Sequence, residues 1–263
     1  MSDRSMLWLA QAFYLVSLLL TVQRLRRGED LPVLQRLNYL VMALGFAAHT
    51  SFLYWRGMQV GRCPLTNPLE VTAFVGWAAV LFYLVVGGAY RVSFLGAFTA
   101  PVVLAINGVA LVLPVDRPAR ELAARSPWVE AHAAIAIVAG GALALAAVAA
   151  GMYLWQEQQL KTRRLSRAFL LLPPLEQLDV IRFRLIVIGF ALLTVGVVGG
   201  FVSYQIGGHW PAVKIAWALS VWAVYGLMTV GQAGRLWRGR RMAWGALVAF
   251  VWLLTGFWGV NFW

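Results

Sequence analysis

The chain has 263 residues, of which 61% are hydrophobic and only 12% are charged. A water-soluble domain usually carries about 25% charged residues and could not bury this much apolar surface, so the composition excludes a soluble fold. In a membrane protein, a formal charge of +12 chiefly sets orientation and attracts anionic membrane lipids, and it does not indicate nucleic-acid binding. The single cysteine, Cys63, excludes an intramolecular disulfide and a cysteine metal cluster.

Eight long apolar segments follow one another along the chain. Each approaches or exceeds the ~20 residues that a helix needs to cross the ~30 Å hydrocarbon core. They cover residues 6–25, 35–55, 69–90, 93–114, 129–155, 183–204, 212–231 and 242–262. We therefore predict an all-α, polytopic integral membrane protein with about eight transmembrane helices, forming a single membrane domain over residues 1–263.

The first apolar segment is predicted to be a retained helix. It lacks a basic stretch before it and a small-residue cleavage site after it, and basic residues follow it instead. In the fourth segment, Pro101 is expected to kink the helix. The fifth segment consists almost entirely of small residues, which favours close helix packing.

The basic residues divide unequally between the two sides of the predicted bundle. The odd-numbered connections carry 15 of them and the other side carries 7. The positive-inside rule then places the odd connections in the cytoplasm and both termini on the outer, periplasmic side. We expect the protein in the bacterial cytoplasmic (inner) membrane.

All three histidines fall near the outer face in this orientation. His49 lies in the outer half of the second segment, His132 opens the fifth, and His209 lies between the sixth and seventh. Imidazole in or beside hydrocarbon is costly unless it is paired or ligated, so these residues are functional candidates. Nitrogen ligands suit iron, copper or zinc. The alternative is that they are ordinary interfacial polar residues.

The outer connection 56–68 leads into Glu70 at the start of the third segment. One interpretation is that Glu70 is a first-turn acid, which is favourable at a helix N-terminus. The other is that it pairs with Arg56 or Arg62, or holds a ligand group.

Tryptophans and one lysine gather in residues 205–222, QIGGHWPAVKIAWALSVW. Trp210, Trp217 and Trp222 supply large flat surfaces, and Lys214 shares a helix face with Trp217. An aromatic belt at the membrane boundary is one explanation. The functional alternative is a hydrophobic shelf for a planar ligand such as porphyrin, with Lys214 near its propionates.

Several short stretches, in this order and spacing, resemble the cytochrome c assembly proteins, the family that includes CcsA, CcmC and the shorter HemX-type members. The likeness spans about residues 30–262. It is carried by GRCPLTNPLE at 61–70 with Trp77, FTAP at 98–101, PWVEAH at 127–132, LEQLD at 175–179, IGFALLTVGVVGG at 188–200, GHWPAVKIAWALSVWAVYG at 208–226 and FWGVN at 257–261.

The resemblance implies a haem site on the outer face. In haem-handling members a tryptophan-rich segment cradles haem, and flanking histidines supply axial ligands. By position, His132 matches the first flanking histidine, and Trp210, Lys214, Trp217 and Trp222 fall within the cradle. The family's W-x-W-D-P-K-E pattern has lost its aspartate here, and no histidine follows the final segment. His209 and His49 are the substitutes for a second iron ligand. This degraded motif is closest to the HemX-like branch.

Four functions remain open at this point. The first is a haem-binding assembly factor of cytochrome c biogenesis, rather than a stand-alone enzyme, with haem, apocytochrome c and a partner membrane subunit as partners. The second is a HemX-like regulatory or scaffold protein acting through the loop 156–182. The third is an accessory subunit of a respiratory or assembly complex. The fourth, a transporter, is disfavoured because the segments contain few ionisable residues.

Overall fold

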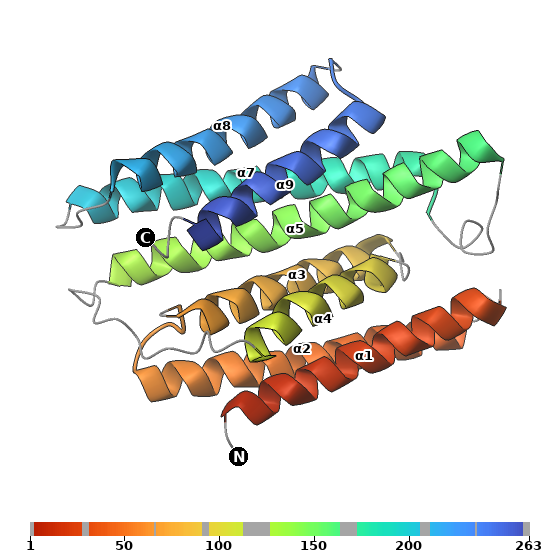
Figure 1. The fold of residues 1–263 in the computed structure, drawn as a ribbon, viewed down its shortest axis with the longest axis horizontal. Helices are drawn as coiled ribbons and strands as arrows, with labels where there is room; N and C mark the ends of the chain where they lie inside the picture. Colours follow the sequence, from red (N-terminus) through yellow and green to blue (C-terminus); the bar gives the residue numbers. More distant parts are fainter. Residues whose placement is uncertain are drawn as a thin grey trace. The chain divides into compact units, whose positions relative to one another are not determined.

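The computed structural model describes residues 3–27, 32–65, 67–90, 95–112, 127–163, 173–205, 211–234 and 236–259. In these ranges all the regular structure is helical, and each apolar segment corresponds to one helix (Figure 1). The helices are α1 (Asp3–Arg27), α2 (Pro32–Val60), α3 (Pro68–Tyr90), α4 (Leu95–Val112), α5 (Pro127–Thr162), α7 (Leu175–Gln205), α8 (Ala212–Ala233) and α9 (Arg240–Gly259). The predicted all-α class is confirmed for these residues.

Five of the helices are long and apolar enough to cross a membrane. These are α1, α3, α5, α7 and α8, with mean hydropathies between 1.5 and 2.6. Within the described residues, α4 counts as a shorter apolar helix, Phe98–Val112, and α2 and α9 are not among the candidate spans. The chain is therefore a multi-pass membrane protein, whereas the number of eight crossings and the outer position of both termini stay predictions.

Helices α5 and α7 extend furthest beyond their apolar segments. The predicted connection 156–182 is partly helical, because α5 continues to Thr162 and α7 begins at Leu175. Polar side chains support the extension of α5, where Lys161 pairs with Glu157 one turn earlier at 2.7 Å. A long apolar segment marks the part of a helix that lies in lipid. It does not indicate a polar continuation of the same helix.

The helices form two compact units. The N-terminal unit comprises Met1–Leu122 and Gln156–Pro174, and the C-terminal unit comprises Ala123–Trp155 and Leu175–Trp263. The expectation of a single membrane domain concerns how these units assemble, and it stays a prediction.

Buried polar side chains join the helices of the N-terminal unit. Ser17 of α1 donates to Asn38 of α2 at 2.7 Å, and Asn38 donates to Thr21 at 3.3 Å. Gln11 of α1 donates to the carbonyl of Leu104 in α4 at 3.1 Å. Such hydrogen bonds are expected between packed apolar helices, where a polar group has no contact with water.

Helix α7 packs on different helices with opposite faces in the C-terminal unit. Gly189 lies against Leu143 of α5 with no room for a side chain. On the other face, Trp222 of α8 donates from Nε1 to Thr194 at 3.0 Å. Glycines thus let α5 approach closely, and a hydrogen-bonded indole fixes α8.

Candidate functional site

His132 lies near the start of α5 and is held by α7. Its Nδ1 lies 2.5 Å from the carbonyl oxygen of Gly196. Because a carbonyl can only accept, Nδ1 carries the proton, and in the neutral ring the lone pair is on Nε2. Metal-bound histidines are usually oriented in this way, by a hydrogen bond from the other ring nitrogen to a carbonyl or carboxylate. This arrangement suits a neutral imidazole that would ligate a metal through Nε2, and the role of His132 as an iron ligand stays a prediction.

Two neighbouring glycines of α7 lie beside His132, and one of them, Gly200, makes room for its ring. A Cβ atom at Gly200 would lie 2.8 Å from Cε1 of His132, whereas a Cβ at Gly199 would lie 3.6 Å from Cβ of His132. The ring therefore rests on the backbone at Gly200, and a methyl group there would displace it. These glycines belong to the segment 188–200, whose likeness to the family was noted from the sequence.

Lys214 lies close enough to His132 for their charges to interact. It is in the first turn of α8, which begins at Ala212. The start of α5, the last turns of α7 and the start of α8 therefore meet at one end of the C-terminal unit. A role for Lys214 beside a ligand stays a prediction.

The two tryptophans of α8 pack on different neighbours. Trp217 lies directly against Gly256 of α9 and donates to the carbonyl of Trp252 at 3.3 Å. Trp222 bonds to Thr194 of α7 and packs beside Phe190, with ring centroids 5.7 Å apart. Five residues correspond to about 140° around a helix, so the two indoles lie on different sides of α8, and a shelf that includes Trp210 stays a prediction.

His49 lies in the N-terminal unit and is completely buried. Its Nδ1 is 3.2 Å from the hydroxyl of Tyr14, and its Nε2 makes no hydrogen bond within the described part of the chain. Phe52 packs beside the ring, with centroids 6.4 Å apart. His49 thus belongs to a different unit from His132, and the convergence of the three histidines stays a prediction. His209 and Trp210 lie outside the described residues.

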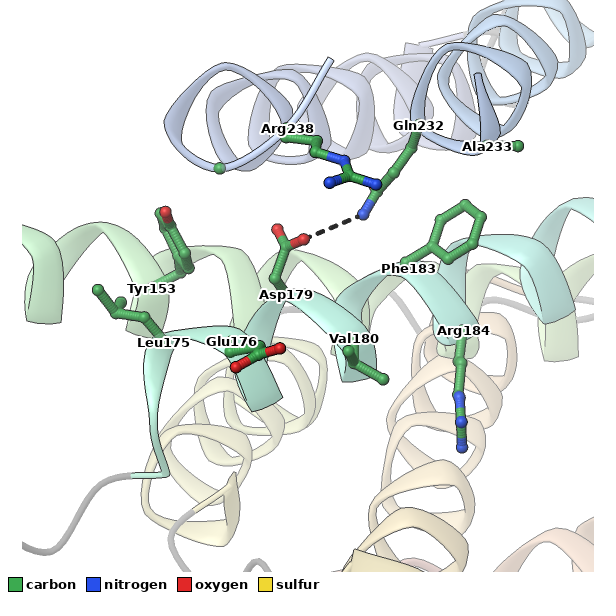
Figure 2. A pocket seen from close by; sticks show the side chains of 11 residues that line it. Tyr153, Leu175, Glu176, Asp179, Val180, Phe183, Arg184, Gln232, Ala233 and Arg238 are labelled. Atoms are coloured by element: carbon green, nitrogen blue, oxygen red, sulfur yellow. Dashed lines mark hydrogen bonds between the residues drawn. The ribbon is translucent and has the colours of Figure 1, made fainter. Parts of the chain in front are cut away.

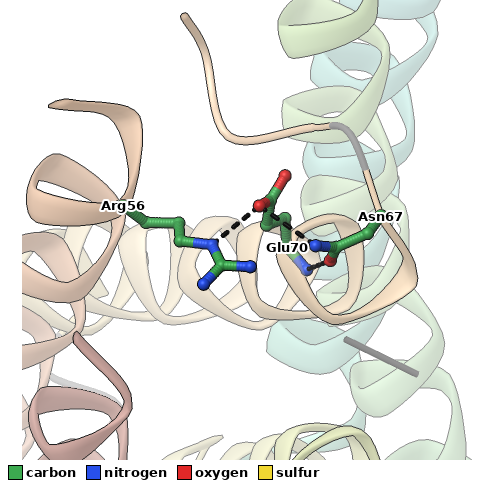
Figure 3. A network of polar contacts seen from close by, with 3 residues as sticks. All are labelled: Arg56, Asn67 and Glu70. Carbon is green, nitrogen blue, oxygen red and sulfur yellow. Dashed lines mark hydrogen bonds and ion pairs between the residues drawn. The ribbon is translucent and has the colours of Figure 1, made fainter. Parts of the chain in front are cut away.

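Glu70 is a first-turn acid of α3 and also half of an ion pair (Figure 3). Its Oε1 accepts from Arg56 Nε at 2.8 Å and from Asn67 Nδ2 at 3.1 Å. Asn67 in turn caps the helix, since its Oδ1 accepts from the Glu70 backbone N–H at 2.9 Å. With Pro68 in the first turn, this is a variant of the capping box, with asparagine in the capping position. The expected pairing with Arg56 is confirmed, and these contacts favour a structural role for Glu70.

The structure contains a polar pocket that the sequence did not indicate (Figure 2). It lies far from His132, since Tyr153 in its wall is 21 residues further along α5, or about 30 Å. Arg182 is completely buried beside it, pairing with Asp179 and donating to the carbonyl of Gly239 at 3.4 Å. The available signal was LEQLD at 175–179 followed by an arginine within one turn, at the edge of an apolar segment.

Comparison with known proteins agrees with these sequence patterns. The family described as "Cytochrome C assembly protein" matches residues 65–263. The chain is 28% identical to the cytochrome c biogenesis protein CcsA of Synechococcus sp. (strain RCC307), over 89% of this chain and 84% of that protein. It is 30% identical to CcsA of Synechococcus sp. (strain CC9605), over 84% and 82%. It is 29% identical to CcsA of Parasynechococcus marenigrum (strain WH8102), also over 84% and 82%.

These relatives carry the name CcsA, so the closer likeness to the HemX-like branch stays a prediction. The family match covers all of the C-terminal unit, including His132 and the glycines that hold it. From this match and the likeness along most of its length, the chain belongs to the cytochrome c assembly protein family.

Proposed function

We propose that this protein binds haem at the His132 end of its C-terminal unit and presents it during cytochrome c biogenesis. The observation that carries the proposal is the hydrogen bond from His132 Nδ1 to Gly196, which directs the lone pair of the neutral ring to Nε2. Membership of the cytochrome c assembly family supports haem as the ligand, because relatives are named cytochrome c biogenesis proteins.

The residues around His132 suit such a cargo in part. Nε2 of His132 would ligate the iron, and Lys214 would pair with a propionate. His209 is the proposed second ligand, and His49 is the reserve. Trp210, Trp217 and Trp222 would contribute apolar surface, although Trp217 and Trp222 already pack on separate helices. Haem would supply the iron. The residues of this chain would hold and orient the haem and expose it to a partner.

Location and partners follow from the same proposal. The excess of arginines in the odd connections supports an outer position for His132 in the bacterial cytoplasmic membrane. There the cargo would face apocytochrome c, whose reduced thiols receive haem in the family's chemistry. A partner membrane subunit would complete the cradle, because the tryptophan motif of this chain lacks the family's aspartate.

An absorption spectrum tests the proposal. Protein purified after expression with ample haem is expected to show a Soret band, and His132→Ala is expected to remove it. Added imidazole should restore the band in His132→Ala, because a free ligand can occupy the place of the lost ring. His49→Gln tests the reserve ligand, and it should retain the band because His209 is the proposed second ligand.

Two results would contradict the proposal. A wild-type protein without a Soret band under these conditions would show that haem is not its cargo. A band that survives His132→Ala but disappears in His49→Gln would place the iron in the N-terminal unit. Gel filtration of each variant shows that it remains folded.

A further inference from the structure

Arginines are concentrated between α8 and α9, and no acidic residue lies among them. Arg235, Arg238, Arg240 and Arg241 all fall in the connection and in the first turn of α9. Arg235 lies outside the described residues, and the other three are exposed. The side chains of Arg238 and Arg241 have no ion-pair partner in the part of the chain that the structure describes. No part of the haem proposal uses these residues.

The connection is anchored to the helices on both sides of Arg238. Before it, the Trp237 backbone N–H donates to the carbonyl of Gly231 at 3.2 Å, and the indole rests on Gly231, where a Cβ atom would lie 2.7 Å from Cε3. After it, the carbonyl of Gly239 accepts from Nη1 of Arg182 at 3.4 Å. The backbone of Arg238 is thus held in place before any ligand binds, which lowers the entropic cost of binding.

Arg238 lines the polar pocket, whose volume of about 660 Å³ is far above the ~30 Å³ occupied by one water molecule. It lies on the same side of α7 as Asp179 and Gln232 (Figure 2). Asp179 is already paired, because it binds Arg182 and accepts from Nε2 of Gln232 at 3.3 Å. The other charged lining residues, one acid and one arginine, point to the opposite side of α7. The side of the pocket with Arg238 therefore has a net positive charge, which suits an anion.

The position of the pocket indicates where such an anion comes from. Leu175 and Ala233, both in its lining, are end residues of the candidate spans Leu175–Val202 and Ala212–Ala233. A span ends where the hydrocarbon core meets the lipid headgroups. The arginine-rich connections are predicted to face the cytoplasm, and the cytoplasmic leaflet carries anionic lipid. The phosphate of a membrane lipid is therefore the anion at this level.

Exposed apolar side chains next to Arg238 suit the rest of a lipid. Leu236 is 75% exposed and Trp237 is 43% exposed. Tryptophan at a membrane boundary lies at the headgroup level, and a guanidinium can bind a phosphate through two parallel hydrogen bonds. We propose that the connection between α8 and α9 binds the headgroup of an anionic phospholipid. The phosphate pairs with Arg238, and the acyl chains lie beside Leu236 and Trp237.

Lipid titration of the purified, full-length protein tests this site. Native mass spectrometry in detergent measures the binding of short-chain phosphatidylglycerol, phosphatidylethanolamine and phosphatidylcholine. Phosphatidylglycerol carries a net negative charge and the other two carry none, so it should bind about tenfold more tightly. Equal binding of the three lipids would overturn the proposal.

Charge variants assign the site to Arg238. Arg238→Gln should weaken the binding of phosphatidylglycerol about fivefold, the effect of one arginine near an anionic lipid. Arg238→Lys keeps the charge and should retain most of the binding. Arg163→Gln is the matched control, because it removes an exposed arginine that follows α5 and does not line the pocket. It should bind as the wild type does. Both positions are exposed, so unfolding temperatures should be unchanged.

The outcomes separate a defined site from general attraction by positive charge. Equal losses in Arg238→Gln and Arg163→Gln would overturn the proposal, because the overall charge would then attract the lipid. Unchanged binding in Arg238→Gln would overturn it as well. Free glycerol phosphate tests the source of the phosphate. If it binds as tightly as phosphatidylglycerol, the site serves a soluble phosphate ester and the proposed lipid is wrong. If it binds much more weakly, the acyl chains contribute and the ligand is a membrane lipid.

Discussion

Glu70 is a buried anion whose replacement should be costly. It is completely buried, and its partner Arg56 is 16% exposed. Glu70→Gln keeps the shape and an acceptor for Asn67 but removes the negative charge that pairs with Arg56. We expect this change to lower the free energy of unfolding by about 2–3 kcal/mol, because breaking a buried ion pair strands one charge. Thermal unfolding of the purified protein in detergent measures the loss.

Glu157→Gln is the matched control for this prediction. Glu157 pairs with Lys161, whose side chain is 56% exposed, so its loss should cost less than about 1 kcal/mol. Equal destabilisation by the two variants would contradict the assignment of Glu70 to a buried structural pair.

The sequence predicted the contacts of some residues and not those of others. The pairing of Glu70 with Arg56 followed from charges at the two ends of one short connection. The cap made by Asn67 was missed, although asparagine before Pro68 with an acid three residues later is a known start signal. The contacts of Arg182 could not be predicted. Arg182 joins α5, α7 and the connection to α9, and one sequence does not reveal which distant residues meet.

The packing of α5 against α7 should tolerate alanine at one of two neighbouring glycines of α7 but not at the other. Gly200→Ala places a methyl group 2.8 Å from the His132 ring, so the ring or the helix must shift. We expect this variant to lose about 1–3 kcal/mol of stability through overpacking, and to lose the Soret band if haem is bound at His132. Unfolding temperature and the absorption spectrum are the two measurements.

Gly199→Ala, one residue earlier, is the control for this pair. Its methyl group would lie 3.6 Å from Cβ of His132, an ordinary contact, and alanine favours a helix over glycine. It should be as stable as the wild type or slightly more so. If Gly199→Ala were the more damaging of the two, the packing of His132 on Gly200 would be wrong.

The helices themselves were well predicted, because long apolar segments report directly on burial in lipid. Their ends were predicted less well, as the polar last turns of α5 and the first turns of α7 show. The tryptophan shelf was expected because tryptophans gather in residues 205–222 and because this segment resembles the family's tryptophan-rich motif. Spacing gives the angle between Trp217 and Trp222 but not the helices that surround them, and these decided that the indoles serve two separate contacts.

For the whole molecule, the undecided quantity is the number of membrane crossings, and α4 is the critical helix. Its 18 residues span about 27 Å, slightly less than the hydrocarbon core. Met58, in the last turn of α2, and Thr162, the last residue of α5, are both exposed, and α3, α4 and α5 lie between them in the chain. If all three cross, the two positions lie on opposite sides of the membrane. If α4 does not cross, they lie on the same side.

Cysteine labelling decides between these topologies. In a Cys63→Ser background, we expect Met58→Cys to react with a membrane-impermeant maleimide in intact cells. Thr162→Cys should react only after the membrane is opened, because the arginine-rich connections are predicted to face the cytoplasm. Labelling of both positions from the same side would show that α4 does not cross. Labelling of Thr162→Cys alone in intact cells would reverse the orientation, and would place the His132 end of the C-terminal unit on the cytoplasmic side, where it could not present haem to an outer partner.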